Sequence, residues 1–266
     1  MAARSMWKGS ISFGLVNIPV KVYLATEDRE FSFNQLCPNG HRIQYKRWCP
    51  VEEKEIGFNE IKKGYEVSKN SYIAIEKKDI DNIKLKTTNT IDVKEFVEAK
   101  DFDPILIERS YYVAPDTKRG AVDKAYSLLA RVLSETNKIA VGKVVFKDKE
   151  HVVALRAYQR GIIMHMLHYL DEVRPVNEIE GMANIQKTGI GNKEEISLGK
   201  MLVQNLSTKH FDMSKYSDSY AQELKNLIDA KAKGKTYAKS VPVEKESPKD
   251  LVAALKASLQ KTKARQ

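Results

Sequence analysis

Short segments in which apolar and polar residues alternate recur along the first two thirds of the chain. Ile11, Phe13 and Leu15 alternate with small residues, and the alternation resumes from Val20 to Leu24, with Pro19 at the break. Similar runs follow at Ser71–Ile75, Thr90–Phe96, Ile105–Val113, Ile139–Phe146, Val152–Tyr158 and Ile162–Tyr169. A period of two is that of half-buried strands, and many short strands with polar punctuation are typical of a barrel or a sandwich.

Other stretches have helical spacing. The longest expected helix in this part covers Ala121–Glu135, and its predicted apolar face consists of Val122, Ala125, Leu128, Leu129 and Val132. Shorter or later helices are predicted at Glu76–Asn82, Glu195–Leu206 and Ser217–Lys233. The predicted fold class is therefore β-rich α+β.

The end of the chain has its own pattern. Residues 234–246 are rich in Lys and Pro without periodicity, which predicts a flexible linker. A last helix is expected after Ser247 as N-cap and Pro248 in the first turn. Its apolar stripe is formed by Leu251, Val252, Leu255 and Leu259.

Positive charge is concentrated in the same region. The net charge is +10, and +7 of it falls between Lys231 and Gln266. Excess positive charge calls for a polyanionic partner, so any such surface on the rest of the chain must be a local patch.

Several classes of protein are not expected. No stretch approaches the roughly 18 apolar residues of a membrane span, and the opening residues lack the apolar core of a secretory signal. Two cysteines do not imply a disulfide scaffold. We expect a cytoplasmic protein with reduced thiols.

The run from Met6 to Tyr23, MWKGSISFGLVNIPVKVY, resembles the first segment of prokaryotic Ku proteins. Further segments resemble the family in the same order: Gly64–Glu66, Asp103–Ile105, Tyr111–Asp116, Glu150–Arg156, Tyr169–Arg174, and Phe211–Asp212 with Lys215, Tyr216 and Tyr220. The resemblance covers nearly the whole chain.

This resemblance implies a Ku-type β-barrel core over residues 1–175 with an inserted bridging arm at about 28–65. A helical C-terminal arm would follow over 176–233, and a basic linker and terminal partner-binding helix over 234–266. The large α/β domain that precedes this core in eukaryotic Ku has no room here. The family implies a homodimeric ring that binds ends of linear double-stranded DNA in non-homologous end joining, is nucleoid-associated when bound, and recruits and stimulates DNA ligase D. It implies neither catalytic residues nor a cofactor.

The candidate DNA contacts come from the segment that forms the bridge in the family. Arg42, Lys46 and Arg47 stand among aromatic residues from His41 to Trp48 without an acid between them. Such cations would neutralise phosphates without reading bases. The alternative is a solvated strand with Trp48 packed inward. Weaker candidates for contact with DNA are Lys62, Lys63, Lys143 and Lys147.

A metal site in this segment is a less favoured interpretation. Cys37, His41 and Cys49 have the right chemistry, but Glu52 stands where a second cysteine would complete a Cys-x-x-Cys pair. Structural zinc prefers four thiolate or imidazole ligands. We therefore expect no metal.

The terminal helix is the candidate partner site. An isolated helix of this length is marginal in water, so its stripe of Leu251, Val252, Leu255 and Leu259 is expected to dock in a groove, either on DNA ligase D or back on its own barrel. Lys261, Lys263 and Arg265 nearby would add a non-specific phosphate contact or a solubilising tail.

Two other classes of function compete with end binding. A metal-dependent nuclease or a ligase needs carboxylates clustered on adjacent strand ends or a phosphate-binding loop, whereas the acids here, Asp101 and Asp103 included, are scattered over helix-like and loop stretches and no such loop is present. A chromosomal architectural protein that binds through its basic tail would have equal affinity for linear and circular duplexes.

Overall fold

The computed structural model describes residues 3–83, 89–116, 122–147, 149–182, 192–236 and 251–263, with the side chains of 122, 123, 251 and 261–263 excepted. The chain divides into two compact units, residues 1–174 and 175–266, and each is described by itself.

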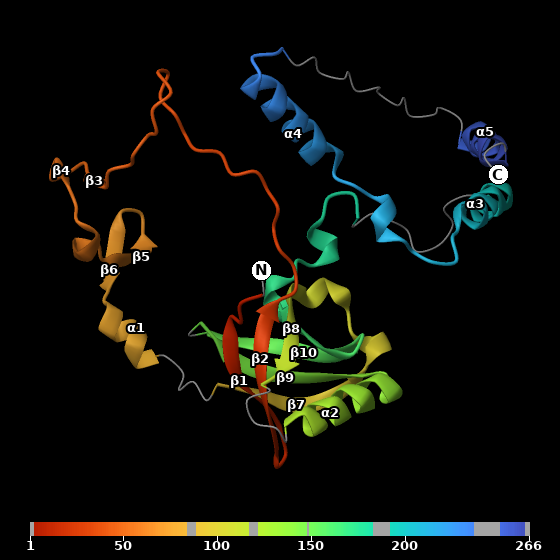
Figure 1. Ribbon diagram of the computed structural model, residues 1–266, viewed down its shortest axis with the longest axis horizontal. Helices are drawn as coiled ribbons and strands as arrows, with labels where there is room; N and C mark the ends of the chain where they lie inside the picture. Colours follow the sequence, from red (N-terminus) through yellow and green to blue (C-terminus); the bar gives the residue numbers. More distant parts are fainter. Residues whose placement is uncertain are drawn as a thin grey trace. The chain divides into compact units, whose positions relative to one another are not determined.

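A closed barrel of seven strands forms the centre of the first unit (Figure 1). Its strands are β1 (Trp7–Phe13), β2 (Val16–Leu24), β7 (Thr90–Glu98), β8 (Ile107–Pro115), β9 (Lys138–Phe146), β10 (Lys149–Tyr158) and β11 (Gly161–Leu167). They follow one another around the barrel in the order β1-β2-β8-β11-β10-β9-β7. All neighbouring strands are antiparallel except β1 and β7, whose parallel pairing closes the barrel. The predicted β-rich class and the Ku-type barrel are confirmed.

The β1–β2 hairpin turns earlier than the sequence suggested. Gly14 has a φ of +58°, which a glycine adopts readily, and Leu15 at the turn is fully exposed instead of belonging to a strand. Pro19 lies inside β2, opposite Ser10 of β1. The carbonyl of Pro19 faces β8 and accepts from the backbone N–H of Asp116, just past the end of β8. Its missing N–H therefore interrupts no bond to β1.

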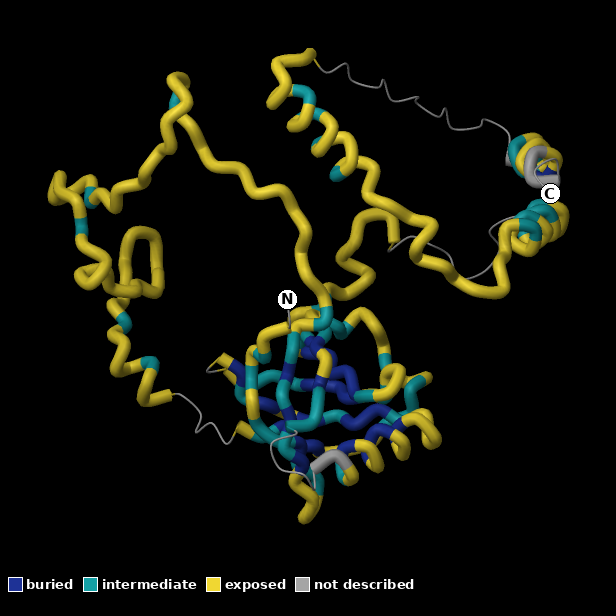
Figure 2. Tube along the Cα trace, in the orientation of Figure 1, coloured by how far each residue is buried: buried dark blue, intermediate teal, exposed yellow. Residues whose placement is uncertain are grey.

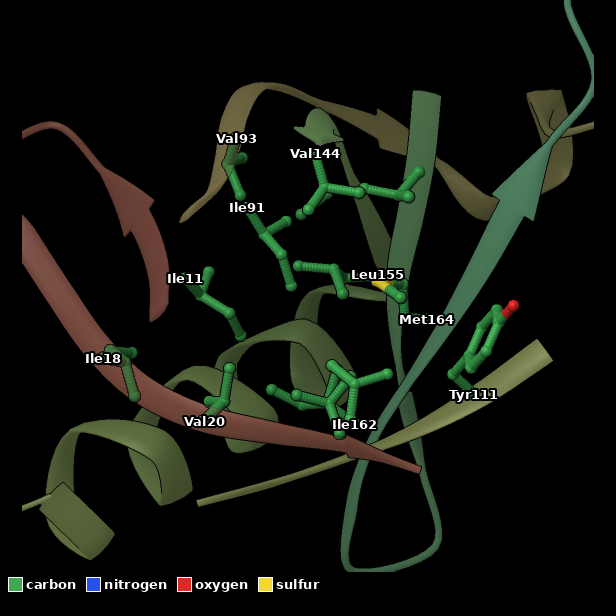
Figure 3. Packing of buried hydrophobic residues seen from close by; sticks show 14 of the residues in the cluster. Ile11, Ile18, Val20, Ile91, Val93, Tyr111, Val144, Leu155, Ile162 and Met164 are labelled. Carbon is green, nitrogen blue, oxygen red and sulfur yellow. The ribbon is translucent and has the colours of Figure 1, made fainter. Parts of the chain in front are cut away.

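Apolar side chains from all seven strands fill the barrel interior, as Figure 3 shows. Helix α2 (Val122–Thr136) contributes Tyr126, Leu129, Ala130 and Leu133 to the same core. The hydroxyl of Tyr126 donates to the carbonyl of Val113 and accepts from the backbone N–H of Ile162 at 2.9 Å, which ties α2 to β8 and β11.

The predicted apolar face of α2 was right for Leu129, which belongs to the core, and for Ala125, which packs against it, but wrong for Leu128 and Val132. Leu128 and Val132 are exposed, and the buried row begins at Tyr126. Tyr126 was absent from the predicted face, yet a tyrosine whose hydroxyl has hydrogen-bond partners can be buried as well as a leucine.

Residues 25–83 form an arm without a core of its own. It contains β3 (Trp48–Cys49), β4 (Lys54–Glu55), the 3-10 turn η1 (Phe58–Glu60), β5 (Lys63–Ser68), β6 (Ser71–Ile75) and helix α1 (Lys77–Ile83). β3 pairs with β4, and β5 pairs with β6, in separate two-stranded hairpins. None of residues 24–83 is buried, whereas the buried residues of this unit all lie in the barrel strands and α2 (Figure 2).

The second unit contains α3 (Lys193–Leu206), α4 (Ser219–Ala232) and α5 (Leu251–Lys263). Asn192 caps α3: its side chain accepts from the N–H of Glu195 at 2.9 Å, and Glu195 returns a bond to the N–H of Asn192. Asp218 caps α4 in a similar way. Further 3-10 turns of the chain are η2 (Ala99–Asp101), η3 (Pro104–Leu106), η4 (Leu170–Glu172), η5 (Val176–Glu178) and η6 (Met213–Lys215).

Helices α3 and α5 pack against each other (Figure 1). Residues 237–250, with most of the predicted linker and the predicted caps Ser247 and Pro248, lie outside the described residues. Within the part of the chain that the structure describes, no helix combines the length and the apolar character that crossing a membrane requires.

Candidate nucleic-acid interface

The predicted basic segment is presented on the arm with every residue from 41 to 48 exposed. Arg42 pairs with Leu36 in an isolated bridge, and the N–H of Ile43 donates to the carbonyl of Gln35 at 3.0 Å. Together with the bond from the N–H of Cys37 to the carbonyl of His41 at 2.8 Å, these nested antiparallel contacts fold residues 35–43 into a small loop. The guanidinium of Arg42 is carried on this loop, and among the described residues no carboxylate forms an ion pair with it.

The two neighbouring cations differ from Arg42. The ammonium of Lys46 lies 3.0 Å from a carboxylate oxygen of Glu55, because the pairing of β3 with β4 brings Glu55 beside the segment. The guanidinium of Arg47 lies 5.1 Å from the centre of the Phe58 ring, in a cation–π contact that leaves its charge in place. Trp48 is 59% exposed, so the alternative with Trp48 packed inward is wrong.

Lys62 and Lys63 lie at the start of β5 and line a groove of about 710 Å³ between η1, the β5–β6 hairpin and α1. The floor of this groove is apolar and consists of Phe58, Ile61, Ile75 and Ile80. Glu76 and Asp81 line the same groove as the lysines, so it combines charges of both signs with apolar side chains.

Lys143 and Lys147 belong to the barrel and not to the arm. The ammonium of Lys143 lies 2.8 Å from a carboxylate oxygen of Glu150 on the neighbouring strand, and this hydrogen bond raises the pKa of Lys143. Lys147 is exposed at the end of β9 with a φ of +51°. Lys143 is thus already paired with a carboxylate, while Lys147 is exposed on a turn.

The possible metal ligands are only partly brought together. Cys37 and His41 face each other across a turn, with the thiol sulfur 3.6 Å from Nδ1 and 3.3 Å from the backbone nitrogen of His41. Cys49 lies in β3. Among the described residues, no group of three or more His, Cys, Asp or Glu side chains is arranged to hold a metal ion.

The apolar stripe of the terminal helix is covered by α3. Leu259 is buried, Val252 and Leu255 are half-buried, and the ammonium of Lys256 lies 2.9 Å from a carboxylate oxygen of Glu194 on α3. The side chain of Leu251 lies outside the described residues. The helix therefore has a docking surface within its own unit, which neither alternative considered from the sequence had included.

One polar cluster of the barrel was not found from the sequence. His165 is 4% exposed on the outer side of β11, with Nδ1 2.8 Å from the hydroxyl of Ser110 and Nε2 accepting from Arg156 at 2.9 Å. Burial, and then the charge of Arg156, lowers the pKa of His165. The three residues come from β8, β10 and β11, so only the order of the strands could have revealed them.

Comparison with known proteins agrees with this arrangement. The family model described as "Ku70/Ku80 beta-barrel domain" matches residues 12–198, which includes the last two residues of β1, the other six strands of the barrel and all of the arm. The chain therefore carries the barrel domain of the Ku class.

Curated relatives extend the match beyond the barrel. The chain is 41% identical to the non-homologous end joining protein Ku of Archaeoglobus fulgidus, over 98% of this chain and 100% of that protein. It is 36% identical to the proteins of the same name from Desulfitobacterium hafniense and Bacillus subtilis, over 97% of this chain and 88% and 82% of those proteins. The chain belongs to the Ku family. This family is named for its part in non-homologous end joining and not for a catalysed reaction, which confirms the prediction of a protein that is not an enzyme.

Proposed function

We propose that this protein is a homodimeric ring that binds the ends of linear double-stranded DNA without sequence specificity during non-homologous end joining. The observation that carries the proposal is the arm of residues 25–83, which exposes both cations and large apolar side chains inside a chain matched to Ku proteins over almost its full length. Each part of the proposal has its own support.

The case for a dimer is that the arm has no buried core of its own. Its exposed large apolar residues include Phe33, Leu36, Tyr45, Trp48, Val51, Phe58, Tyr65, Tyr72 and Ile73. A segment that buries so little apolar surface gains little free energy to offset the entropy of ordering it. Exposed apolar side chains in such number are typical of an interface, and the groove at Phe58 and Ile61 would accept side chains from the arm of a second copy.

The case for DNA comes from the charges that remain free of carboxylates. Arg42 and Arg47 are exposed and contact no acid among the described residues, and Lys62 and Lys63 lie on the same arm. Fixed cations bind phosphates without reading bases, so affinity should not depend on sequence and should fall steeply with salt. Lys46 and Lys143 are weaker candidates because each faces a carboxylate.

We further infer that α5 recruits and stimulates DNA ligase D. Its stripe of Val252, Leu255 and Leu259 rests on α3 through a surface that is short and includes one exposed ion pair, which is worth roughly 0–1 kcal/mol. Such a contact is weak enough for a partner groove to replace it. Removal of residues 248–266 should spare DNA binding and abolish stimulation of the ligase.

Light scattering of the purified chain tests the dimer. We expect twice the mass of one chain for the wild type and for Phe211→Asp, which alters an exposed phenylalanine of the second unit. Phe58→Asp alters an equally exposed phenylalanine in the arm and should give monomers. A monomeric wild type, or a Phe58→Asp variant that stays dimeric, contradicts the proposed interface.

A further inference from the structure

The outer side of the barrel carries tyrosines on neighbouring strands. Tyr23 of β2 stands directly opposite Tyr112 of β8, and directly opposed side chains of antiparallel strands lie within contact distance. On the other side of Tyr112, the ring of Tyr158 from β10 reaches across β11, with 6.0 Å between the two ring centres and 34° between their planes. Tyr158 is paired with Gly161 of β11, which has no side chain in the way.

These tyrosines point out of the barrel, because the residues that alternate with them on each strand belong to the core: Val22, Tyr111, Val113 and Leu155. Tyr112 is 42% exposed and Tyr158 is 37% exposed, so each ring offers part of a face to solvent. We call Tyr23, Tyr112 and Tyr158 the tyrosine face. Its rings lie outside the core that fills the barrel interior.

Positive charge borders the tyrosine face. Lys8 and Lys21 stand opposite each other on β1 and β2, in the row next to Tyr23. Arg156 lies two residues before Tyr158 on the same outer side of β10, and Arg160 follows at the β10–β11 turn. One of these cations is already paired, because the ammonium of Lys21 lies 2.7 Å from a carboxylate oxygen of Asp116. The surroundings of the tyrosine face therefore favour an anion.

The buried cluster below the face keeps Arg156 in position. Its Nε donates to Nε2 of His165, which must be unprotonated on that nitrogen to accept. Burial and the charge of Arg156 both lower the pKa of His165, so the imidazole stays neutral and leaves the charge of Arg156 uncompensated. An arginine held by a neutral partner retains its full attraction for a phosphate.

A cleft of about 620 Å³ adjoins the two exposed rings. It is lined by Tyr112, Tyr158 and Arg160, by Gln159 and Gly161 of the β10–β11 turn, and by Tyr126 and Ser127 of α2. Aromatic rings, an arginine and polar groups in one open cleft match the requirements of a nucleobase attached to a phosphate, because every base has a π-face that stacks on an aromatic ring.

We propose that the tyrosine face binds unpaired bases of a single-stranded DNA overhang by stacking them on Tyr112 and Tyr158 while Arg156 and Arg160 contact the phosphates. This inference rests on the proposed function, since the overhang arrives joined to a duplex that the protein binds. It adds a second contact with a different chemistry: the arm holds phosphates of paired DNA, and the tyrosine face holds bases that have lost their partners. We favour single-stranded DNA over a peptide as the ligand because cations border the rings and because an aromatic ring can stack on any base.

The test uses the full-length protein and three labelled duplexes with the same paired region. One is blunt, one has an overhang of about ten unpaired thymidines, within the 4–16 nucleotides that single-strand sites span, and one has an abasic overhang of the same length. The thymidine and abasic overhangs have equal charge, so their difference reports stacking alone. We expect the thymidine overhang to bind at least about fivefold more tightly than the abasic one for each ring that stacks.

Variants assign this difference to the tyrosine face. Tyr112→Ala with Tyr158→Ala should remove the advantage of thymidine and leave the affinity for the blunt duplex unchanged. Tyr112→Phe with Tyr158→Phe retains the rings and should retain the advantage, while unchanged binding of the blunt duplex by the alanine variant excludes a folding defect as the cause. Tyr220→Ala, at an exposed tyrosine of α4, is the matched control and should behave as the wild type.

The outcomes separate this inference from the proposed function. Equal binding of thymidine and abasic overhangs by the wild type overturns the stacking site and would leave the face to a protein partner. An advantage that persists without both rings also overturns it. Failure to bind the blunt duplex overturns the proposed function instead, and an oligothymidine strand alone then still tests the tyrosine face.

Discussion

Replacing single charges on the arm should change the salt dependence of DNA binding by amounts that the ion pairs determine. The logarithm of the binding constant falls with the logarithm of salt concentration by about 0.9 for each phosphate that a cation neutralises. Arg42 forms no ion pair among the described residues, so Arg42→Gln should reduce the slope by about 0.9 for each protomer and about 1.8 for a dimer.

Lys46 should respond differently because Glu55 already holds it at 3.0 Å. Lys46→Gln should change the slope less than Arg42→Gln does. Glu55→Gln should act in the opposite direction: it frees Lys46 for a phosphate and makes the slope steeper, by up to about 0.9 for each protomer. The two variants on either side of one ion pair therefore have predicted effects of opposite sign.

Fluorescence anisotropy of a labelled linear duplex at several salt concentrations between 50 and 200 mM measures these slopes. Over this fourfold range a slope change of 1.8 corresponds to about tenfold in relative affinity, which the assay resolves easily. Lys100→Gln, at an exposed lysine of η2, serves as the control and should have the slope of the wild type. An unchanged slope in Arg42→Gln, or a shallower one in Glu55→Gln, would refute the assignment of this loop to DNA.

Three further predictions concern the scaffold. Tyr126→Phe leaves two buried backbone groups without their partner and should cost about 2–4 kcal/mol in urea unfolding, so an unchanged midpoint would show that the hydroxyl is dispensable. The lowered pKa of His165 beside Arg156 means that the unfolded chain takes up a proton near pH 6.5 that the native state refuses, so stability is complete above that pH and declines below it by at most about 1.4 kcal/mol per pH unit. His165→Gln should flatten this decline in melting temperature between pH 7.5 and 5.5, and an equally steep decline would assign it to other groups. Glu194→Lys should speed hydrogen exchange in α5, and adding Lys256→Glu should reverse the effect; exchange that is indifferent to both would mean that the ion pair does not hold α5 on α3.

The barrel was predictable because its strands are half-buried, so that alternation survives in the sequence. The predicted Ile139–Phe146 and Ser71–Ile75 agree with β9 and β6 to within a residue. The apolar pattern mispredicted the burial of two residues. Leu15 is apolar yet exposed at the hairpin, and Tyr126 is polar yet buried in α2.

For the candidate site, the sequence indicates the residue types but not their pairings. The segment from Arg42 to Arg47 is recognisable by its charge, whereas the contact of Lys46 with Glu55 depends on β3 and β4, which are too short to give any periodicity. The contact of Tyr112 with Tyr158 depends on β11 lying between β8 and β10, an order that alternation alone does not encode.

The most direct test of the account is whether binding requires a free DNA end. A labelled linear duplex bound to the wild-type protein is challenged with unlabelled linear, nicked circular and covalently closed circular DNA of the same sequence and length. A ring that threads onto ends predicts that only the linear competitor displaces the label at concentrations near its own affinity, with both circles far weaker. Equal competition by linear and closed circular DNA would contradict the ring and favour a protein that coats duplex DNA through its basic tail.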